Sequence, residues 1–422
     1  MPAASPDNSL SIINGLISEF YRSATDLAPE RIAEREFGVG NFEIKISQRH
    51  MSFRNERDLK EYLSTNAVPY VSSSSAFYKF PSGRPMEKKG WLGSELVFDL
   101  DVTDMDLPCQ LRHGKSWVCS ICLDEVRKET IKLVYDFLIP DFGFSEKEIK
   151  VNFSGNRGYH VHVDNKDMLM LDAAARREVT GYISGSGIEF ADLFPTAGRR
   201  GEKLVGPSAK EKGWRGKIAK NFLSNLNAGV DSLMRMGIEK PIASKLWRSK
   251  GLVQMGIENG NWDMVYIKNK ADFWKGIIDR QAVSQSDKID RNVTNDPTHL
   301  IRLANSIHGG SGLIARKLKA PGALYGFDPM KEAIAFRKGY VKIDAHTGYE
   351  LVMMGQKYGP YAGEIKVPTY VGAEVYVPLL LVVEEAVVPT AHLAMAVLEG
   401  LVGQLVLVVL VLTIQMAAVE AV

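Results

Sequence analysis

One short apolar stretch limits what this chain can fold into, because two acidic residues interrupt it. Residues 95–102 read Glu-Leu-Val-Phe-Asp-Leu-Asp-Val, which predicts a buried strand. Side chains alternate faces along a strand, so Asp99 and Asp101 share one face and their apolar neighbours share the other. Two carboxylates side by side in an apolar strand are costly unless a divalent cation binds them. A solvated strand end is the alternative for an isolated Asp-x-Asp.

Length and overall composition leave the fold class open but set its scale. The chain has 422 residues, of which 45% are hydrophobic, so it can bury a full core. That length fits two or three domains, or one large α/β domain with insertions. The net charge of +2 neither favours nor excludes nucleic acid as a partner. Residues 199–220 hold eight Lys and Arg but two Glu. This local excess is typical of contact with a phosphate backbone, or else of a solvated charged face.

The cysteines point to a metal site. All three lie in one segment, Cys109-x3-His113-x5-Cys119-x2-Cys122. So few cysteines in a chain of this length do not form a disulfide framework and indicate a reducing compartment. Three thiols and one imidazole this close in sequence match a tetrahedral Cys3His zinc site. Four protein ligands leave no open position, so the sequence predicts a structural zinc. Three free buried thiols beside a surface histidine are the alternative.

A second polar motif joins two predicted strands between Val151 and Val163. The segment reads as a hairpin: Val-Asn-Phe, then Ser-Gly-Asn-Arg-Gly, then Tyr-His-Val-His-Val. Two glycines let the turn approach a ligand closely and expose backbone N–H groups. Ser154, Arg157 and His160 can then hold a triphosphate from one side, because arginine makes bidentate phosphate contacts. A plain polar hairpin is the alternative.

A third group of polar residues lies far along the chain. Asp290 and Asp296 precede a segment that carries Arg302 and His308 and ends in a glycine-rich turn. We expect an aspartate on a strand here to supply a third carboxylate, and the arginine and histidine to add phosphate-binding groups. An ordinary loop and turn would also fit this stretch in isolation.

Hydrophobic periodicity places further elements around these motifs. Apolar residues recur at helical spacing near the N-terminus, alternate in a few short segments, and return to helical patterns over a long central stretch. We expect helices at residues 8–24, 29–37, 56–63 and 125–138, a mostly helical region at about 165–285, and strands at 41–47, 340–343 and 349–353.

Together, these motifs occur in an order that closely resembles the small catalytic subunit of archaeal and eukaryotic DNA primases. The order is Asp-x-Asp, the zinc cluster, Ser-Gly-x-Arg-Gly-x-His, a distant Asp and Ser-x-His-Gly, and it spans about residues 15–376. Residues 86–93, Met-Glu-Lys-Lys-Gly-Trp-Leu-Gly, look archaeal. Each motif alone is a weak signal, but the set is specific. The resemblance implies an α/β (α+β) fold, namely the archaeo-eukaryotic primase catalytic core with a zinc-binding insertion and a helical subdomain.

The resemblance also implies roles for individual residues. The family's third catalytic aspartate lies eighteen residues before the late histidine, which favours Asp290 over Asp296. The sequence departs from the family at Asn156, where eukaryotic members tend to carry a second arginine, and at Gly310, where some members carry lysine. The implied residues are catalytic, metal-binding Asp99, Asp101 and Asp290 for Mg²⁺ or Mn²⁺, nucleotide-binding Ser154, Arg157, His160, Arg302 and His308, and zinc-binding Cys109, His113, Cys119 and Cys122.

The resemblance divides the chain into a primase catalytic domain at residues 1–376, with its zinc motif at 109–122, and a C-terminal tail at 377–422 of unknown role. The tail has no Lys or Arg, and its residues 400–419 carry no charge. An uncharged stretch of that length can span a bilayer, but basic flanking anchors are missing and the family is soluble. We expect a strand or helix packed on a partner, or an aberrant C-terminus, rather than a membrane span.

The function that the resemblance implies is that of a nucleotidyltransferase, a DNA-directed RNA polymerase of the primosome. It would make short RNA primers on single-stranded DNA for replication by two-metal catalysis. The implied partners are a large primase subunit in a heterodimer, a single-stranded DNA template and ribonucleoside triphosphates, with deoxyribonucleotides as the other candidate. Residues 1–10 lack a signal-peptide pattern, so we expect the cytoplasm of an archaeal-type cell, at the nucleoid. The alternatives are a primase-polymerase that extends DNA in repair and a non-catalytic, zinc-bearing nucleic-acid-binding subunit.

Overall fold

The structure is a computed structural model that describes residues 6–115, 118–195, 203–286, 290–347, 350–375 and 415–416. Its helices are α1 Pro6–Ser23, α2 Glu56–Thr65, α3 Gln110–His113, α4 Ser120–Lys132, α5 Ala173–Ile183, α6 Phe190–Leu193, α7 Gly213–Ala228, α8 Val230–Arg235, α9 Lys240–Arg248, α10 Lys250–Glu258, α11 Lys270–Ser286, α12 Arg291–Asn295 and α13 Pro329–Glu332. Its strands are β1 Phe37–Gly40, β2 Gln48–Met51, β3 Tyr70–Ser74, β4 Ala76–Tyr78, β5 Trp91–Ser94, β6 Leu96–Asp101, β7 Ile149–Phe153, β8 Gly158–Val163, β9 Leu300–Arg302, β10 Tyr340–Thr347, β11 Leu351–Met353, β12 Gln356–Tyr358, β13 Tyr361–Pro368 and β14 Gln415–Met416.

The central sheet carries the Asp-x-Asp strand. Its order is β6-β8-β7, and both pairings are antiparallel. The predicted strand and the predicted hairpin are therefore both confirmed. In this register Asp99 lies opposite His160, and Asp101 lies opposite Gly158. The apolar residues of β6 are buried and both aspartates are partly exposed, which is the alternation that the sequence predicts. Helix α4 packs on β6 and β8.

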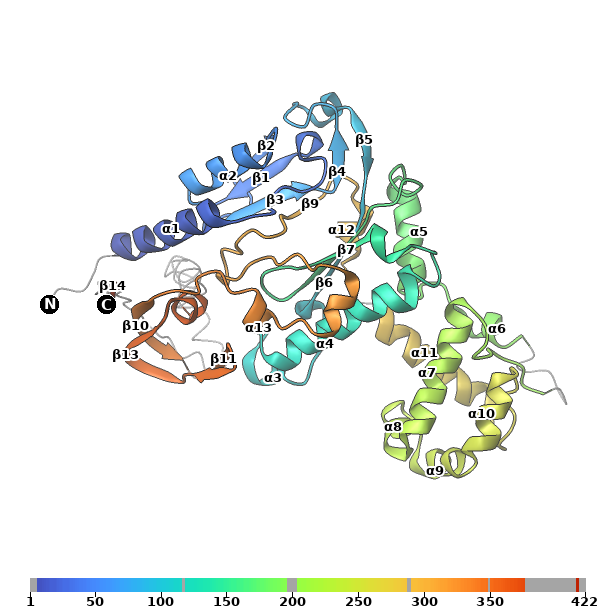
Figure 1. Cartoon of the computed structure of the whole chain (residues 1–422). Coiled ribbons are helices and arrows are strands. Elements are labelled where there is room, and N and C mark those ends of the chain that lie inside the picture. Colours follow the sequence, from blue (N-terminus) through green and yellow to red (C-terminus); the bar gives the residue numbers. More distant parts are fainter. Residues whose placement is uncertain are drawn as a thin grey trace, which may run out of the picture.

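A second sheet has the order β2-β1-β3-β9, again with antiparallel pairings. Helices α1 and α2 pack on each other, and their apolar residues share one buried core with those of β1 and β3 (Figure 1). Both helices occur where the sequence predicts them. The edge strand β9 comes from much later in the chain, and it places Arg302 beside Ser72 of β3. This pairing joins the late polar motif to the N-terminal part of the protein.

Two predicted elements in the N-terminal part are wrong. Residues 29–37 hold only one 3₁₀ turn, because Arg31 has a left-handed φ of 56° and Phe37 already pairs with β3. Residues 41–47 form a loop between β1 and β2 instead of a strand. The Asn41 side chain accepts hydrogen bonds from two of the backbone N–H groups that follow it, which favours a turn over strand pairing.

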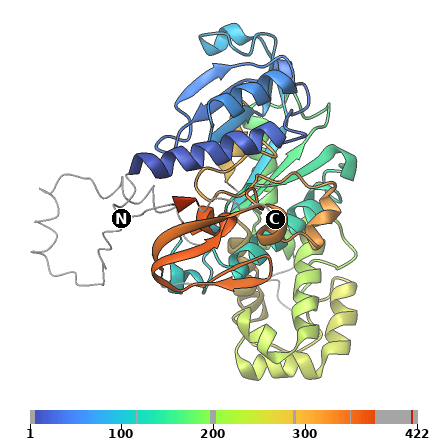
Figure 2. The ribbon, with the colours of Figure 1, turned by 60° about the vertical axis from the view of Figure 1, so that its left-hand side comes forward.

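The segment that was predicted to be mostly helical contains α5 to α11. Helices α7 to α11 project from the rest of the molecule, as both views show (Figures 1 and 2). They have a buried core of their own, in which Trp262 and Trp274 meet edge to face with ring centroids 4.7 Å apart. Phe222 of α7 packs on both rings. This core is separate from the one that fills the sheets.

The C-terminal part contains three antiparallel pairings, β10–β13, β10–β14 and β11–β12. Strands predicted at 340–343 and 349–353 fall on β10 and β11. Of the apolar tail at 377–422, only β14 lies within the described residues, so the predictions for the tail lie outside them. Residues 199–202 of the basic stretch also lie outside. Among the described residues, no helix is long and apolar enough to cross a membrane.

Candidate active site and metal centre

Asp99 and Asp101 lie at the C-terminal end of β6, where the strand turns into a short 3₁₀ helix. The turn itself fixes the second carboxylate. Asp101 Oδ1 accepts hydrogen bonds from the backbone N–H and the hydroxyl of Thr103, each at 2.8 Å. Asp101 is thus the cap of residues 102–104, a common role for aspartate at a helix start. Asp99 has no such local partner and faces the neighbouring elements.

Asp290 lies directly beside Asp99, although 190 residues separate them in sequence. Its backbone N–H donates to the Asp99 carbonyl oxygen at 3.0 Å. The expectation of a strand here is wrong, because Asp290 caps helix α12 through its side chain, which accepts from the Asn292 N–H at 2.8 Å. Thr294 on the same helix donates to the carbonyl oxygen of Val97 at 2.6 Å and ties α12 to β6.

Asp296, the competing candidate, lies at the other end of α12. Its carboxylate accepts from the backbone N–H and the hydroxyl of Thr298 at 2.8 and 2.7 Å. The two candidates also differ in the groups on which their charges act. Asp290 is one of the carboxylates whose charge raises the pKa of Asp99, whereas the charge of Asp296 acts on the Arg176 guanidinium. The geometry therefore favours Asp290 as the carboxylate that faces the Asp pair.

Negative charge is concentrated at this site. Burial raises the pKa of Asp99 from 3.8 to about 7, and repulsion from Asp101, Asp290 and Asp104 adds to the effect. Burial and the same two neighbours, Asp101 and Asp290, raise the pKa of Asp104 as well. A bound cation would offset the repulsion between these partly buried carboxylates. Hard divalent ions prefer such oxygen ligands. The donor set fits Mg²⁺ or Mn²⁺.

The β7–β8 hairpin presents two cationic or polar side chains to this acidic site. Arg157 Nε lies 3.6 Å from Asp101 Oδ1, and His160 Nε2 lies 3.7 Å from Asp99 Oδ1. Ser154 has a local role, because its hydroxyl accepts from the backbone N–H of Gly158 at 3.1 Å and holds the turn closed. The three residues predicted to bind phosphate are thus adjacent, but the hydroxyl of the serine faces its own turn.

The late motif packs against the same hairpin. The Ser311 hydroxyl donates to the carbonyl oxygen of Gly155. Gly155 has a φ of +83°, and a Cβ built on it would lie 2.8 Å from the Cβ of His308. Only glycine fits this close approach. The contact places His308 near both Arg302 and Arg157. Burial lowers the pKa of the His308 imidazole, and the positive charges of these two arginines lower it further.

The ring of Tyr70, on β3, contacts both Arg302 and His308. The Arg302 guanidinium lies over the Tyr70 ring, 4.9 Å from its centroid, and the His308 ring meets the same ring edge-on at 5.5 Å. Arg302 Nη1 is buried without a hydrogen-bond partner among the described residues. A buried, unsatisfied donor on a cation favours an anionic ligand.

Both histidines of the site are neutral near pH 7. Burial lowers the pKa of His160 and of His308 well below 6.5, and nearby cationic side chains lower it further. His308 Nδ1 accepts from the backbone N–H of Gly310 at 3.1 Å, so its proton resides on Nε2. Each ring can therefore donate one hydrogen bond to an anion without adding charge. The positive charge of the site comes from the arginines.

Three residues near the site escaped the sequence analysis. Asp104 follows the Asp pair by three positions, and that spacing was a usable signal. Tyr70 is a buried strand residue whose ring contacts the two late site residues. Lys45 lies in the loop at 41–47 and carried no signal. Burial and the positive charges of Arg302 and Arg157 lower its pKa, which places it among these groups.

A buried ion-pair network holds the start of β6. Glu95 accepts hydrogen bonds from Arg35 at 2.6 and 3.3 Å and lies 3.2 Å from His162 Nδ1. Burial alone would raise the pKa of Glu95, but the charge of Arg35 and the contact with His162 hold this pKa well below its usual value. Arg176 donates to the carbonyl oxygens of Ser94 and Glu95. The strand that carries the Asp pair is therefore anchored at both ends.

The Cys3His cluster forms a compact group between α3 and α4. Sγ of Cys122 lies 3.4 Å from Sγ of Cys109, 3.7 Å from Sγ of Cys119, and 3.5 Å from Nε2 of His113. Ligands about 2.0–2.3 Å from a tetrahedral zinc ion are roughly 3.6–3.8 Å apart. The spacing therefore fits, and this group can hold a metal such as zinc. Among the described residues, it is the one set of three or more His, Cys, Asp or Glu whose ligand atoms all lie within 4.8 Å of one another. The three aspartates are spaced more widely.

The sequence of this chain is similar to those of known proteins over most of its length. A protein-family model described as DNA primase small subunit matches residues 98–320. The DNA primase small subunit PriS of Methanococcoides burtonii is 33% identical over 374 residues, which cover 83% of this chain and 93% of that protein. The chain belongs to the DNA primase small subunit family. The proteins of the same name from Methanothrix thermoacetophila and Thermoplasma volcanium are 32% and 31% identical, and the alignments cover 83% and 84% of this chain and 93% and 92% of theirs.

Family membership confirms the resemblance that the order of motifs indicated, and with it the mixed helix and sheet fold of a primase small subunit. A DNA primase small subunit acts in DNA replication with single-stranded DNA and nucleotides. The chain is accordingly a primer-synthesising enzyme of the nucleotidyltransferase type.

Proposed function

We propose that this small subunit synthesises short RNA primers on single-stranded DNA by two-metal nucleotidyl transfer. One observation supports this most directly. The backbone of Asp290 is hydrogen-bonded to that of Asp99, so a third carboxylate from a distant segment joins the Asp pair. Arg157 and His160 lie next to the Asp pair, and the late motif that carries Arg302 and His308 packs against the same hairpin. An acidic site bordered by cations and neutral donors suits a metal-bound nucleotide.

Asp99, Asp101 and Asp290 would hold the divalent cations. When bound, such ions activate the attacking hydroxyl and compensate the charge of the departing pyrophosphate. The raised pKa of Asp99 supports this role, because a carboxylate that is reluctant to ionise alone gains most from a cation. Asp101 is oriented by its two hydrogen bonds from Thr103, so it needs little rearrangement to bind an ion.

The basic and neutral donors have separate roles in this proposal. Arg157 and Arg302 would bind phosphate oxygens through their guanidinium groups, and Tyr70 would keep the second of these in place. His160 and His308 would each donate one hydrogen bond through Nε2 without adding charge. Ser154 would hold the turn in shape, because its hydroxyl accepts from the backbone N–H groups of Asn156 and Gly158.

The Cys3His group would bind a structural zinc ion through Cys109, His113, Cys119 and Cys122. The ligands connect the loop after the Asp pair to the start of α4, which packs on β6. Burial raises the pKa of Cys119, but hydrogen bonds from Cys122 and His113 outweigh it and lower the pKa to about 7. The thiolate form is therefore populated near neutral pH. The zinc would therefore stabilise the loop that follows the Asp pair and would take no part in the reaction.

The proposed primer synthesis also requires partners and substrates. We propose a heterodimer with a large primase subunit that aids initiation, and ribonucleoside triphosphates as the substrates. The basic stretch that continues into α7 would follow the backbone of the DNA template. The primase catalytic domain would comprise residues 1–376, including the helical insertion at about 165–285.

The test is primer synthesis on single-stranded DNA by the Asp101→Ala variant of the full chain. We expect activity to fall by roughly 10²-fold or more, because one carboxylate of the cation site is lost. Asp106→Ala is the matched control, since this aspartate is highly exposed and lies outside the site. Near-normal activity of Asp101→Ala would refute the metal assignment. Supplying ribo- and deoxyribonucleotides separately distinguishes a primase from a primase-polymerase that extends DNA.

A further inference from the structure

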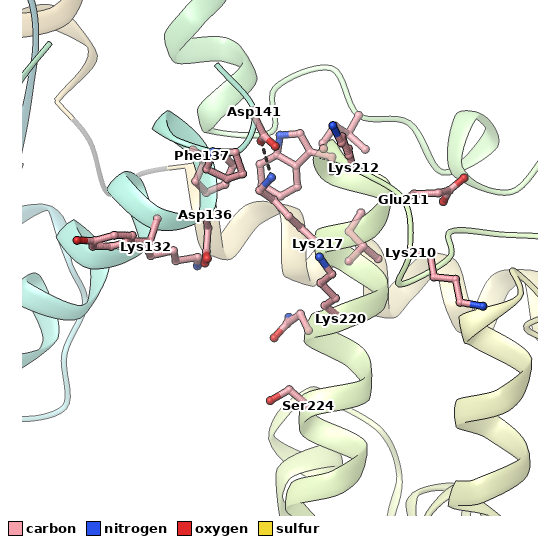
Figure 3. A pocket seen from close by; sticks show the side chains of 17 residues that line it. Lys132, Asp136, Phe137, Asp141, Lys210, Glu211, Lys212, Lys217, Lys220 and Ser224 are labelled. Carbon is pink, nitrogen blue, oxygen red and sulfur yellow. Dashed lines mark hydrogen bonds and ion pairs between the residues drawn. The ribbon is translucent and has the colours of Figure 1, made fainter. Parts of the chain in front are cut away.

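A cavity of about 540 Å³ lies between the π-helix at Leu133–Leu138 and helix α7. Figure 3 shows Lys132 and Asp136 on one wall and Lys217 and Lys220 on the other. Its volume lies within the range of small-molecule sites. None of its lining residues belongs to the acidic site described above. The cavity is therefore a separate feature at the junction of the helical region and the sheet core.

Five lysines line this cavity, and some of them have no ion-pair partner. Lys217 is paired with Asp141, and its ammonium also lies 4.8 Å from the centroid of the Phe137 ring. Lys212 and Lys220 are exposed, and within the described parts of the chain neither forms an ion pair. The Glu211 carboxylate on the same wall is bound by Arg215 at 3.1 Å. Lys210 contacts the amide oxygen of Asn259 at 3.4 Å and forms no ion pair within the described residues, so three ammonium groups are left to attract an anion.

The same cavity has an aromatic wall. Trp214 is half-buried and packs on Phe137, with ring centroids 5.4 Å apart. The Trp214 Nε1–H donates to the carbonyl oxygen of Tyr182 at 2.6 Å, which fixes the indole in place. A rigid, partly exposed indole beside unpaired ammonium groups matches the two halves of a nucleotide, the aromatic base and the phosphate.

The local backbone is the second observation that points to a ligand. The opposite wall is a π-helix, in which Asp136 and Phe137 lie. π-Helices hold one residue more per hydrogen-bonded turn than α-helices, are rare, and occur frequently at functional sites. Here the π-helix follows α4 directly and presents its side chains to the lysines of α7. The irregular backbone and the unpaired charge coincide at one cavity.

We propose that this cavity binds a nucleotide, with the base against Trp214 and the phosphate at Lys212 and Lys220. The nucleotide is either a free nucleoside triphosphate or one unit of a single-stranded nucleic acid. An inorganic phosphate alone would leave most of the 540 Å³ and the indole unused. A purely apolar ligand would cover the ammonium groups without a counter-charge.

The experiment compares a double variant, Lys212→Gln with Lys220→Gln, with a charge-matched control. The control is Lys240→Gln with Lys268→Gln, two exposed lysines of the helical region that do not line the cavity. Full-length proteins are irradiated without divalent cations, in one arm with 8-azido-ATP and in the other with an oligothymidine that carries 5-iodouracil. Labelled peptides are mapped by mass spectrometry, and thermal melting verifies that the variants are folded.

We expect label on the peptides that contain Trp214 or the π-helix, reduced roughly tenfold in the double variant and unchanged in the control. The factor corresponds to the loss of a charge-assisted phosphate contact. Labelling in the azido-ATP arm alone identifies a free nucleotide, and labelling in the oligonucleotide arm alone identifies a strand. Absence of label from these peptides in both arms, or equal labelling of the double variant and the control, would overturn the proposal. Neither outcome depends on whether the acidic site is catalytic.

Discussion

Replacing Asp99 with asparagine should stabilise the metal-free protein at pH 8. In the folded protein the carboxyl has a pKa of about 7 instead of 3.8, so its ionised form opposes folding. The full shift corresponds to roughly 4 kcal/mol, at about 1.4 kcal/mol per pKa unit. The side chain is 26% exposed and is coupled to three other carboxylates, so water and shared repulsion reduce the effect. We expect a gain of about 1–3 kcal/mol in the free energy of unfolding.

The pH dependence gives this prediction a sign. A carboxyl with a raised pKa in the folded state destabilises it fully above about pH 7, and the penalty declines as the pH falls toward 3.8. The advantage of Asp99→Asn should therefore be largest at pH 8 and less than about half as large at pH 5. Asp106→Asn is the control, because its exposed carboxylate has no comparable neighbours and the substitution should change little at either pH.

Thermal melting followed by circular dichroism measures the effect, in buffer freed of divalent cations, with the zinc content of each protein determined and matched. Adding Mn²⁺ should raise the melting midpoint of the wild type more than that of Asp99→Asn, because the variant has lost one ligand of the cation. The reasoning fails if Asp99→Asn lowers the midpoint at pH 8, or if its effect is the same at pH 5 and pH 8.

Three further predictions concern residues around the acidic site. Cys119→Ser should remove bound zinc, as measured by atomic absorption, and lower the melting midpoint. Glu95→Gln should cost about 3–5 kcal/mol in unfolding free energy in urea, because Arg35 would be left buried without its counter-charge. Arg302→Lys should raise the KM for nucleotides roughly tenfold with a smaller change in kcat, since lysine makes no bidentate phosphate contact and does not stack on Tyr70.

Each of these has a matched control. Ser120→Ala, next to the zinc ligand, should retain full zinc. Glu34→Gln removes an exposed carboxylate and should change stability by less than about 1 kcal/mol. Full zinc in Cys119→Ser, or an unfolding free energy of Glu95→Gln equal to that of the Glu34 control, would contradict the corresponding reasoning. For Arg302→Lys, an unchanged KM would do so.

The local motifs could be predicted because each lies within a few residues of sequence. Alternation along β6 places Asp99 and Asp101 on one face in any strand, and the β7–β8 hairpin follows from its glycines. The Cys3His cluster was recognisable from spacing alone. Errors arose where tertiary pairing or a side-chain turn overrode the local pattern, as at residues 29–37 and 41–47.

The sequence by itself determined which chemical groups this protein has and in what order, because strand alternation and short ligand spacings are properties of a few adjacent residues. Only the tertiary structure decided what these groups do to one another. The pairing of β3 with β9 brings Arg302 onto Tyr70, and the segment that begins α12 brings Asp290 to the Asp pair. Burial there raises one carboxyl pKa and keeps both histidines neutral. Burial and charge–charge distance depend on the folded arrangement, so no local pattern encodes them.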